Sequence, residues 1–281
     1  MIKDGTNMFY DSTLALFDSD LSSLVNGTYM FRYTPITLFN RDLSSLVDGS
    51  YMFNGTSLTS FNGNLSSLSD GTNMFSNTHL ASFNGSSSGT YVNLRSIVYG
   101  NGMFGNTYLT AFSGDLGNLI RGSSMFHNTP IELFISDLIS LVYGTNMFQG
   151  TSLTSFSGDL SSLITGSEMF RDTSLTSFSG DLSSLIYGSY MFSGAPLTSF
   201  NSDLRSLADG SSMFYKTSLT SFSSDLSSLV IGSSMFSNTH KRGYTISHWK
   251  MVDVVKTKVT EHVRAEGLTS FNGDLGSLQT G

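Results

Sequence analysis

A motif of 22 residues recurs along most of this 281-residue chain, and it constrains the fold more than any other feature. Each copy contains a Met-Phe pair, and successive pairs lie 22 residues apart except for one interval of 29 residues, between Met74 and Met103. A fixed period of this length is typical of proteins that stack one structural unit on the next. The pairs begin at Met8, Met30, Met52, Met74, Met103, Met125, Met147, Met169, Met191, Met213 and Met235.

Residue types are confined to fixed positions when each repeat is numbered from its Met as position 1. All 22 Phe lie at position 2 or position 10, the 3 Pro lie at position 6, and Gly recurs at position 20. Leu or Ile fills positions 7, 14 and 17 in most repeats. No single repeat can bury these side chains, whereas stacked repeats bury them continuously. These columns therefore predict the core.

Each repeat also predicts its own local structure. The run from position 7 to position 10, commonly Leu-Thr-Ser-Phe, predicts a short strand with position 10 inside and positions 9 and 11 outside. Asp at position 13 predicts an N-cap or an Asx turn, and Thr at position 5 can hydrogen-bond its turn. Gly at position 20 predicts a positive φ or a close approach of the next coil. We expect coils about 4.8 Å apart.

The predicted fold class is a mainly β repeat solenoid with one parallel sheet, short helical turns and one inserted α-helix near the C-terminus. Residues 1–240 contain ten repeats and the start of an eleventh, with a seven-residue Ser/Gly-rich loop insertion near residues 84–92. Residues 241–267 form a non-repeat insert, and residues 268–281 complete the eleventh repeat. Ser247 can cap a helix in the insert, where Val recurs at a spacing of three or four residues.

The insert differs from the repeats in charge and in its aromatic content. It has six basic and three acidic residues, a net charge of +3, whereas the other residues have a net charge of −10. It also contains Trp249, the one Trp of the chain, next to Lys250. Trp249 and Lys250 are therefore candidate binding residues. The alternative is a helix that packs on the flank of the solenoid.

The repeated segments Leu-Thr-Ser-Phe, Leu-Ser-Ser-Leu-x-x-Gly and Met-Phe-x-x-Thr resemble the leucine-rich repeats of BspA-like bacterial surface proteins. The similarity is greatest to the short-repeat subgroup with Met-Phe in each unit, found in gut bacteria and their phages. That family usually has Cys where this chain has Thr56 and Thr78. The resemblance implies a binding module and an extracellular, cell-surface or virion location. The chain itself begins without a signal peptide.

Motifs for chemistry are absent from the sequence. There is no Cys, no His-Glu-x-x-His, no Gly-x-Ser-x-Gly and no phosphate-loop Lys motif, so we expect no enzyme and no cofactor. A net charge of −7 argues against nucleic acid as a partner, and no apolar run reaches the ~20 residues of a membrane span. Capping explains the Asp column without metal, although Ca²⁺ between repeats is an alternative. The column is Asp20, Asp42, Asp115, Asp137, Asp159, Asp181, Asp203 and Asp225.

The outward face of the predicted strands is the other candidate binding surface. Positions 9 and 11 form a small, polar and nearly uncharged comb, which we expect to face a protein or a glycan; the alternative is a passive solvated surface. The candidate residues are Ser155, Ser157, Ser177, Ser179, Ser199 and Asn201. Four apolar residues break this comb and could form a contact patch: Leu16, Leu38, Leu133 and Ile135.

Two classes of function remain open from the sequence. The first is a non-enzymatic binding or adhesion module of a bacterial cell surface or phage particle. The second is a structural spacer or self-assembling solenoid without a ligand of its own. Neither end of the chain has a polar capping repeat, so we also expect end-to-end self-association or a chain cut from a longer protein.

Overall fold

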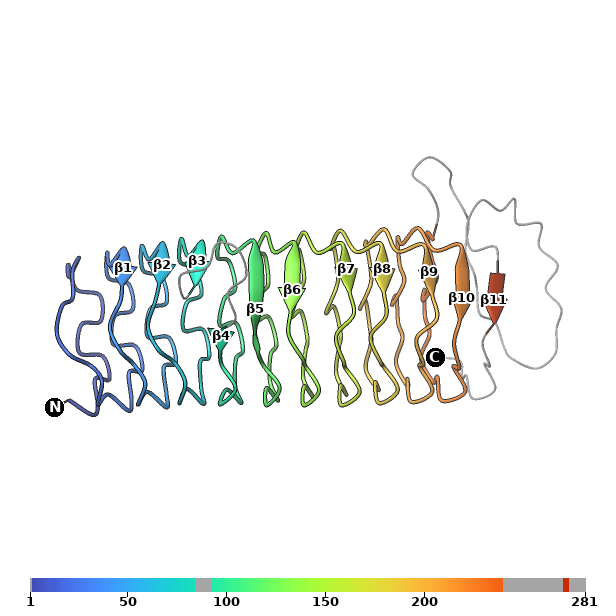
Figure 1. The fold of residues 1–281 in the computed structure, drawn as a ribbon. Coiled ribbons are helices and arrows are strands. Elements are labelled where there is room, and N and C mark those ends of the chain that lie inside the picture. The colour runs from blue at the N-terminus through green and yellow to red at the C-terminus, as the bar shows by residue number, and fades with distance from the viewer. Residues whose placement is uncertain (1, 84–91, 240–269, 273–281) are drawn as a thin grey trace.

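The repeats stack into one elongated solenoid, as the sequence predicts (Figure 1). The computed structural model describes residues 2–83, 92–239 and 270–272. Within these residues the repeats follow one another along the stack in sequence order, so each coil contacts the coils just before and after it. The predicted loop insertion and the predicted C-terminal helix, with its candidate residues Trp249 and Lys250, lie outside the described residues.

Short strands mark one side of the stack in Figure 1, with β4 set apart from the others. Most contain the Ser-Phe of positions 9 and 10, and every pairing is parallel. The strands are β1 (Leu38–Phe39), β2 (Ser60–Phe61), β3 (Ser82–Phe83), β4 (Val92–Asn93), β5 (Ala111–Asp115), β6 (Leu133–Ile135), β7 (Ser155–Phe156), β8 (Ser177–Phe178), β9 (Ser199–Phe200), β10 (Ser221–Ser223) and β11 (Ser270–Asn272).

The prediction of one parallel sheet is wrong, because the described strands form four separate sheets. Their orders are β1-β2-β3, β4-β5-β6, β7-β8 and β11-β10-β9. Most strands contribute only two or three residues, so a small increase in coil separation removes the pairing. The Phe rings of β6 and β7 are 6.2 Å apart and those of β8 and β9 are 6.1 Å apart, whereas the paired strands β7 and β8 hold theirs at 5.8 Å.

A second parallel ladder, which the sequence did not predict, runs along the stack through position 19. Single β-bridges join each residue at this position to its equivalent in the next coil. Unlike the strands of positions 9 and 10, this ladder also continues past the 29-residue interval, where Asp70 bridges Tyr99. The bridged residues are Asp4, Asn26, Asp48, Asp70, Tyr99, Arg121, Tyr143, Thr165, Tyr187, Asp209 and Ile231.

The segment from position 20 to position 4 is a stack of turns, and no helix occurs among the described residues. The predicted short helical turns are therefore wrong. Alternate amides point to the next coil: the N–H of Tyr29 donates to Ser50 O at 3.0 Å and that of Phe31 donates to Met52 O at 2.9 Å. The amide of Met30, between them, donates within its own coil to Gly27 O at 2.9 Å. An α-helix would keep all these bonds within one segment.

Positive φ angles at positions 22 and 4 direct the amides in this way. Every positive φ among the described residues lies at one of these two positions. Most of the residues there are Asn, Asp or Gly, which suit the left-handed region. Others are poorly suited to it, among them Tyr29 (φ 57°), Glu168 (φ 59°) and Lys216 (φ 57°), and at these residues the bonds between coils determine the backbone conformation.

Gly at position 20 allows side chains of the next coil to approach its backbone closely, and its φ is not positive. A Cβ on Gly27 would lie 2.8 Å from Sδ of Met52 and 3.2 Å from Cδ1 of Leu46, both in the next coil. The same relation holds at Gly49, where the nearest atom is Sδ of Met74 at 2.9 Å. Of the two roles predicted for this Gly, the close approach is confirmed and the left-handed turn is wrong.

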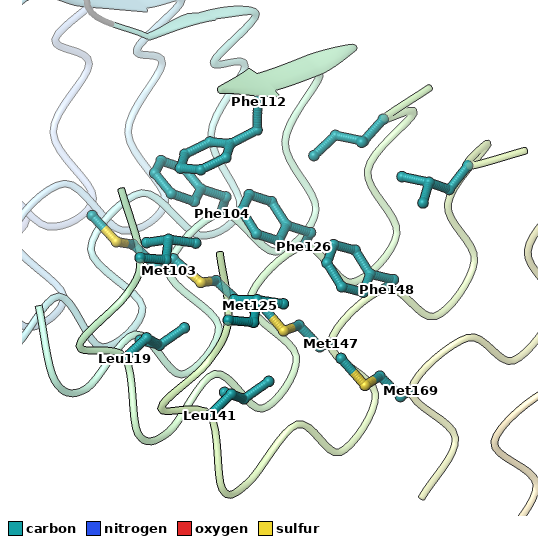
Figure 2. Packing of buried hydrophobic residues seen from close by; sticks show 14 of the residues in the cluster. Met103, Phe104, Phe112, Leu119, Met125, Phe126, Leu141, Met147, Phe148 and Met169 are labelled. Carbon is teal, nitrogen blue, oxygen red and sulfur yellow. The ribbon is translucent and has the colours of Figure 1, made fainter. Parts of the chain in front are cut away.

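The core consists of columns of identical side chains, as the sequence predicts. Figure 2 shows Met103, Met125, Met147 and Met169 in one row and Phe104, Phe126 and Phe148 in another. The position 2 rings stack without interruption from Phe9 to Phe236, with centroids 5.4–5.6 Å apart. Edge-to-face contacts join this row to the position 10 rings, a favourable aromatic geometry.

The position 10 rings form a second row that the insertion modifies. Phe61 stacks on Phe83 at 5.5 Å, as predicted. On either side of the insertion, Phe83 and Phe112 both contact Phe104, at 4.9 and 5.8 Å. At the insertion, the position 10 rings of Phe83 and Phe112 are therefore connected through the position 2 ring of Phe104.

Thr at position 5 satisfies its hydroxyl inside the core, as expected from the sequence. Thr34 Oγ1 donates to Phe31 O at 2.7 Å, and Thr56 Oγ1 donates to Phe53 O at 2.9 Å. Both side chains are buried, so these bonds remove the cost of an unpaired hydroxyl. The same bond recurs in Thr78, Thr107, Thr129, Thr151, Thr173 and Thr217.

The first described coil buries its apolar residues less completely than the coils that follow. Met8 is 44% exposed, whereas Met30 in the next coil is fully buried. Phe9, Leu14 and Phe17 are only partly buried against the core. End-to-end association through such a face stays a prediction.

We predict that Phe156→Ala lowers the free energy of unfolding by about 3–5 kcal/mol, since it leaves a cavity between stacked rings. Ser177→Ala, on the outward side of the neighbouring strand, should change it by less than about 0.5 kcal/mol. Urea unfolding followed by circular dichroism measures both. Equal losses in the two variants would contradict the assignment of inside and outside positions.

We also predict that Ser124→Asn stabilises the protein by about 0.5 kcal/mol, because Asn tolerates the left-handed region better than Ser. Ser124 has φ 57°, and Asn occupies the same position at Asn73 and Asn146. Ser157→Asn, on a strand-face position without positive φ, is the control and should be neutral. Thermal melts compare the two, and a loss of stability in Ser124→Asn would contradict the role given to this turn.

Candidate functional site

The predicted comb lies on the exposed side of the strands. Ser155, Ser177 and Ser199 at position 9, and Ser157, Ser179 and Asn201 at position 11, are all exposed. The Phe between them in each repeat is buried. The alternation of inward and outward residues is thus confirmed, while binding by these residues stays a prediction.

Thr hydroxyls border the comb and connect neighbouring coils. Thr176 Oγ1 donates to Thr154 O, and Thr220 Oγ1 donates to Thr198 O, both at 3.1 Å. The Thr176 amide also donates to Thr154 O, at 2.9 Å. These bonds fix position 8 of each coil relative to position 8 of the next coil. The comb residues beside it therefore have well-defined positions.

Seven of the eight residues of the Asp column, all except Asp137, form Asx turns, one of the two roles predicted for the column. The amide N–H two residues on donates to the side-chain oxygen, at 2.8 Å from Ser161 to Asp159 and at 2.8 Å from Ser227 to Asp225. Asn64 and Asn93 make the same turn, with distances of 3.0 and 3.2 Å. The N-cap role is wrong because no helix follows in these described residues.

Hydrogen bonding to these carboxylates favours their charged form. Bonds from the hydroxyl and amide of Ser161 lower the pKa of Asp159. Bonds from the amide and hydroxyl of Ser227 lower the pKa of Asp225. The pKa of Asp203 is lowered mainly by its bond with Arg205. The carboxylates of Asp159, Asp203 and Asp225 are therefore ionised at neutral pH and give this face negative charge.

Two surface clefts open along the Asp column, and the sequence did not predict them. The first, about 380 Å³, is lined by Gly114, Asp115, Phe134, Ile135, Ser136, Asp137, Phe156, Ser157 and Gly158. The second, about 440 Å³, is lined by Ser179, Gly180, Asp181, Ser183, Asn201, Ser202, Asp203 and Arg205. The first spans the break between β6 and β7, and the second spans the break between β8 and β9.

The clefts divide the predicted candidate residues into two groups. Ser157 lines the first cleft, and Ser179 and Asn201 line the second. The position 9 residues Ser155, Ser177 and Ser199 lie on the exposed strands beside the clefts. The sequence did not predict the contribution of Asp137, Asp181 and Arg205, because the Asp column indicated capping or Ca²⁺ alone and the pattern did not single out Arg205.

The second cleft is polar and contains one internal ion pair. Arg205 pairs with Asp203 across two residues, and hydrogen bonding to Asp203 raises the pKa of Arg205. Asp181 has its own Asx turn, with the Ser183 amide at 2.8 Å. This cleft offers hydroxyl, amide and carboxylate groups to a polar ligand.

An aromatic cluster on the turn segment is a further surface that sequence reasoning missed. The guanidinium carbon of Arg32 lies 4.4 Å from the ring centroid of Tyr33, and 5.3 and 5.2 Å from those of Tyr29 and Tyr51. Arg32 Nε also donates to Asn54 Oδ1 at 2.9 Å. The signal available in the sequence was the occurrence of three Tyr at positions 22 and 4 within 23 residues, where most other repeats have no aromatic residue.

Two classes of site are absent from the described part of the chain. No group of three or more His, Asp or Glu side chains is placed to hold a metal ion within residues 2–83, 92–239 and 270–272. In the same residues no helix has the length and apolar character needed to cross a membrane.

We predict that the Asx carboxylates make stability fall in acid. Their pKa values in the folded state lie below 3.8, so the stabilisation is complete above the unfolded value of about 3.9 and is lost as pH falls through the folded value. The double variant Asp159→Asn/Asp225→Asn keeps the turns, as Asn64 shows, and should lose less between pH 7 and pH 3. Thermal melts at both pH values measure this, and an equal loss in variant and wild type would contradict it.

Comparison with known proteins identifies the repeats. The chain matches the family profile described as BspA type leucine rich repeat region, with six copies over residues 5–103, 26–137 and 142–257. Searches of curated proteins and of solved structures give no significant match. The match covers most of the chain and agrees with the stacked coils and their apolar columns, so the resemblance seen in the sequence is confirmed. The chain belongs to the BspA-type leucine-rich repeat family.

Proposed function

We propose that this protein is a non-enzymatic binding or adhesion module of a bacterial cell surface or a phage particle, and that its strand face binds a protein or a glycan. The observation that carries the proposal is the run of exposed comb residues from Ser155 to Asn201 above the buried rings of Phe156, Phe178 and Phe200. BspA-type repeats are surface-associated or protein-binding modules, which supports this class of function and location.

The rigidity of the comb supports binding. Ser177 and Ser179 flank Phe178, whose ring is stacked 5.8 Å from that of Phe156 and packs edge-on against Phe192. A side chain held on such a frame loses little further freedom when a ligand binds. Rigid presentation therefore compensates for the small contact area that each Ser or Asn offers.

Repetition of the comb also supports binding to a repeated ligand. Equivalent residues recur in successive coils, so several weak contacts can form along one extended chain. Contacts made in sequence on one ligand add through a high effective concentration. A glycan or an extended polypeptide has the matching geometry.

One observation favours the alternative, a structural or self-assembling solenoid. Aliphatic side chains at position 18 are exposed in several coils, namely Val25, Val47, Ile120 and Val230. A column of this kind could pack against the same column of a second copy. The ladder at position 19 beside it would keep the column straight.

We predict that Ser179→Arg/Asn201→Arg abolishes capture of the ligand found on glycan and protein arrays, because two long charged side chains would cover the comb. Ser174→Arg, exposed at position 6 of the same coil as Ser179, is the matched control and should keep binding. Equal capture by all three proteins would contradict the strand-face site. A protein that captures nothing, and whose light scattering rises with concentration, would instead support self-assembly.

A further inference from the structure

The repeat of residues 125–146 departs from the others on its outward side. Leu133, Ile135 and Ile139 occupy positions 9, 11 and 15, and they are 48%, 53% and 50% exposed. In the sequence, no other repeat has an aliphatic residue at position 11 or 15, where polar residues or Gly stand. The apolar columns of the core are unchanged in this repeat, so folding does not require these substitutions.

The first cleft lies beside these exposed residues. It follows the break between β6 and β7, where the rings of Phe134 and Phe156 are 6.2 Å apart. Phe134 is only partly buried, whereas the other position 10 rings from Phe39 to Phe222 are buried. Phe134, Ile135 and Phe156 therefore give this mainly polar cleft one apolar patch that an apolar side chain could cover.

The rim of this cleft is acidic. Asp115 and Asp137 line it, and Glu132 is exposed at position 8 of the same repeat. No Lys or Arg is among the residues that line the cleft. The negative charge is therefore not neutralised within the lining, unlike that of the second cleft, where Arg205 pairs with Asp203.

We propose that the first cleft, which extends from Gly114 to Gly158, binds a basic amphipathic segment of a partner protein. One apolar side chain covers Phe134, Ile135 and Phe156, and a neighbouring Lys or Arg places its cation beside Asp137 and Asp115. This inference rests on the proposed function, since it assigns a partner class to one part of the strand face.

Charge and polarity together favour a basic polypeptide over a glycan. A neutral glycan would cover the apolar patch with hydroxyl groups and would leave the carboxylates without a cation. An anionic glycan would be repelled by Asp115, Asp137 and Glu132. A Lys or Arg side chain has both an apolar stem and a cationic end, so it can satisfy the apolar patch and the rim at once.

Three fluorescein-labelled eight-residue peptides test the proposal by fluorescence anisotropy. One alternates Leu with Lys, one alternates Leu with Glu, and one alternates Ser with Lys. We expect the Leu/Lys peptide to bind at least about tenfold more tightly than either of the others, because only it has both required groups. Equal binding of the Leu/Lys and Leu/Glu peptides, or of the Leu/Lys and Ser/Lys peptides, would overturn the proposal.

Variants locate the binding. Ile135→Ser and Asp137→Asn introduce residue types that other repeats hold at these positions, and each should weaken Leu/Lys binding about tenfold. Leu38→Ser, which removes an exposed aliphatic side chain at position 9 of another repeat, and Asp225→Asn, at position 13, make comparable changes elsewhere on the face and should keep full binding. Thermal melts confirm that all four variants are folded.

The outcome separates this inference from the proposed function. If the cleft variants and the distant controls lose peptide binding equally, the first cleft is not the site and the inference fails. If Ser179→Arg/Asn201→Arg stops capture on the arrays while the cleft variants bind the Leu/Lys peptide as wild type does, the inference fails and the proposed function stands.

Discussion

The alternating amides of the turn segment are the interaction on which the rest of the structure depends. Amides at positions 20, 22, 2 and 4 donate to the next coil, as Gly27, Tyr29, Phe31 and Tyr33 do at 2.8–3.0 Å. Backbone groups inside a stack must be paired, and no single coil can pair them. Each coil therefore needs its neighbour to pair its backbone amides. This pairing makes the stack continuous and aligns the equivalent Met and Phe side chains of successive coils.

The two sides of the solenoid differ because this ladder lies on one of them. The position 2 rings next to it keep a spacing of 5.4–5.6 Å throughout. The position 10 rings vary, from 5.2 Å between Phe222 and Phe271 to 6.3 Å between Phe17 and Phe39, with 6.2 Å between Phe134 and Phe156. Because the short strands pair only within four separate sheets, the coils can separate locally on this side without unfolding the stack. The two clefts open at such separations.

The core and the exposed comb could be predicted from the sequence, but the backbone of the turns could not. The recurring Phe and Leu positions indicate which side chains are buried. Thr and Asp are residue types that commonly hydrogen-bond to nearby backbone groups, as Thr56 and Asp159 do. Tyr29 and Glu168 give no sign of a positive φ, because their conformation is imposed by bonds between coils. The clefts escaped prediction for a related reason: they depend on separations of a few tenths of an ångström, which residue types do not encode.

Because the repeats are so similar, a residue that differs from its equivalents in the other repeats needs a specific explanation. In a stack where Ser serves at position 11 in many coils, packing cannot explain Ile135, since its side chain is exposed and the core beneath it keeps the common residues. An exposed aliphatic side chain increases the risk of unwanted association. Such a residue persists more readily where a partner covers it, and the acidic rim of Asp115 and Asp137 restricts which partner can do so.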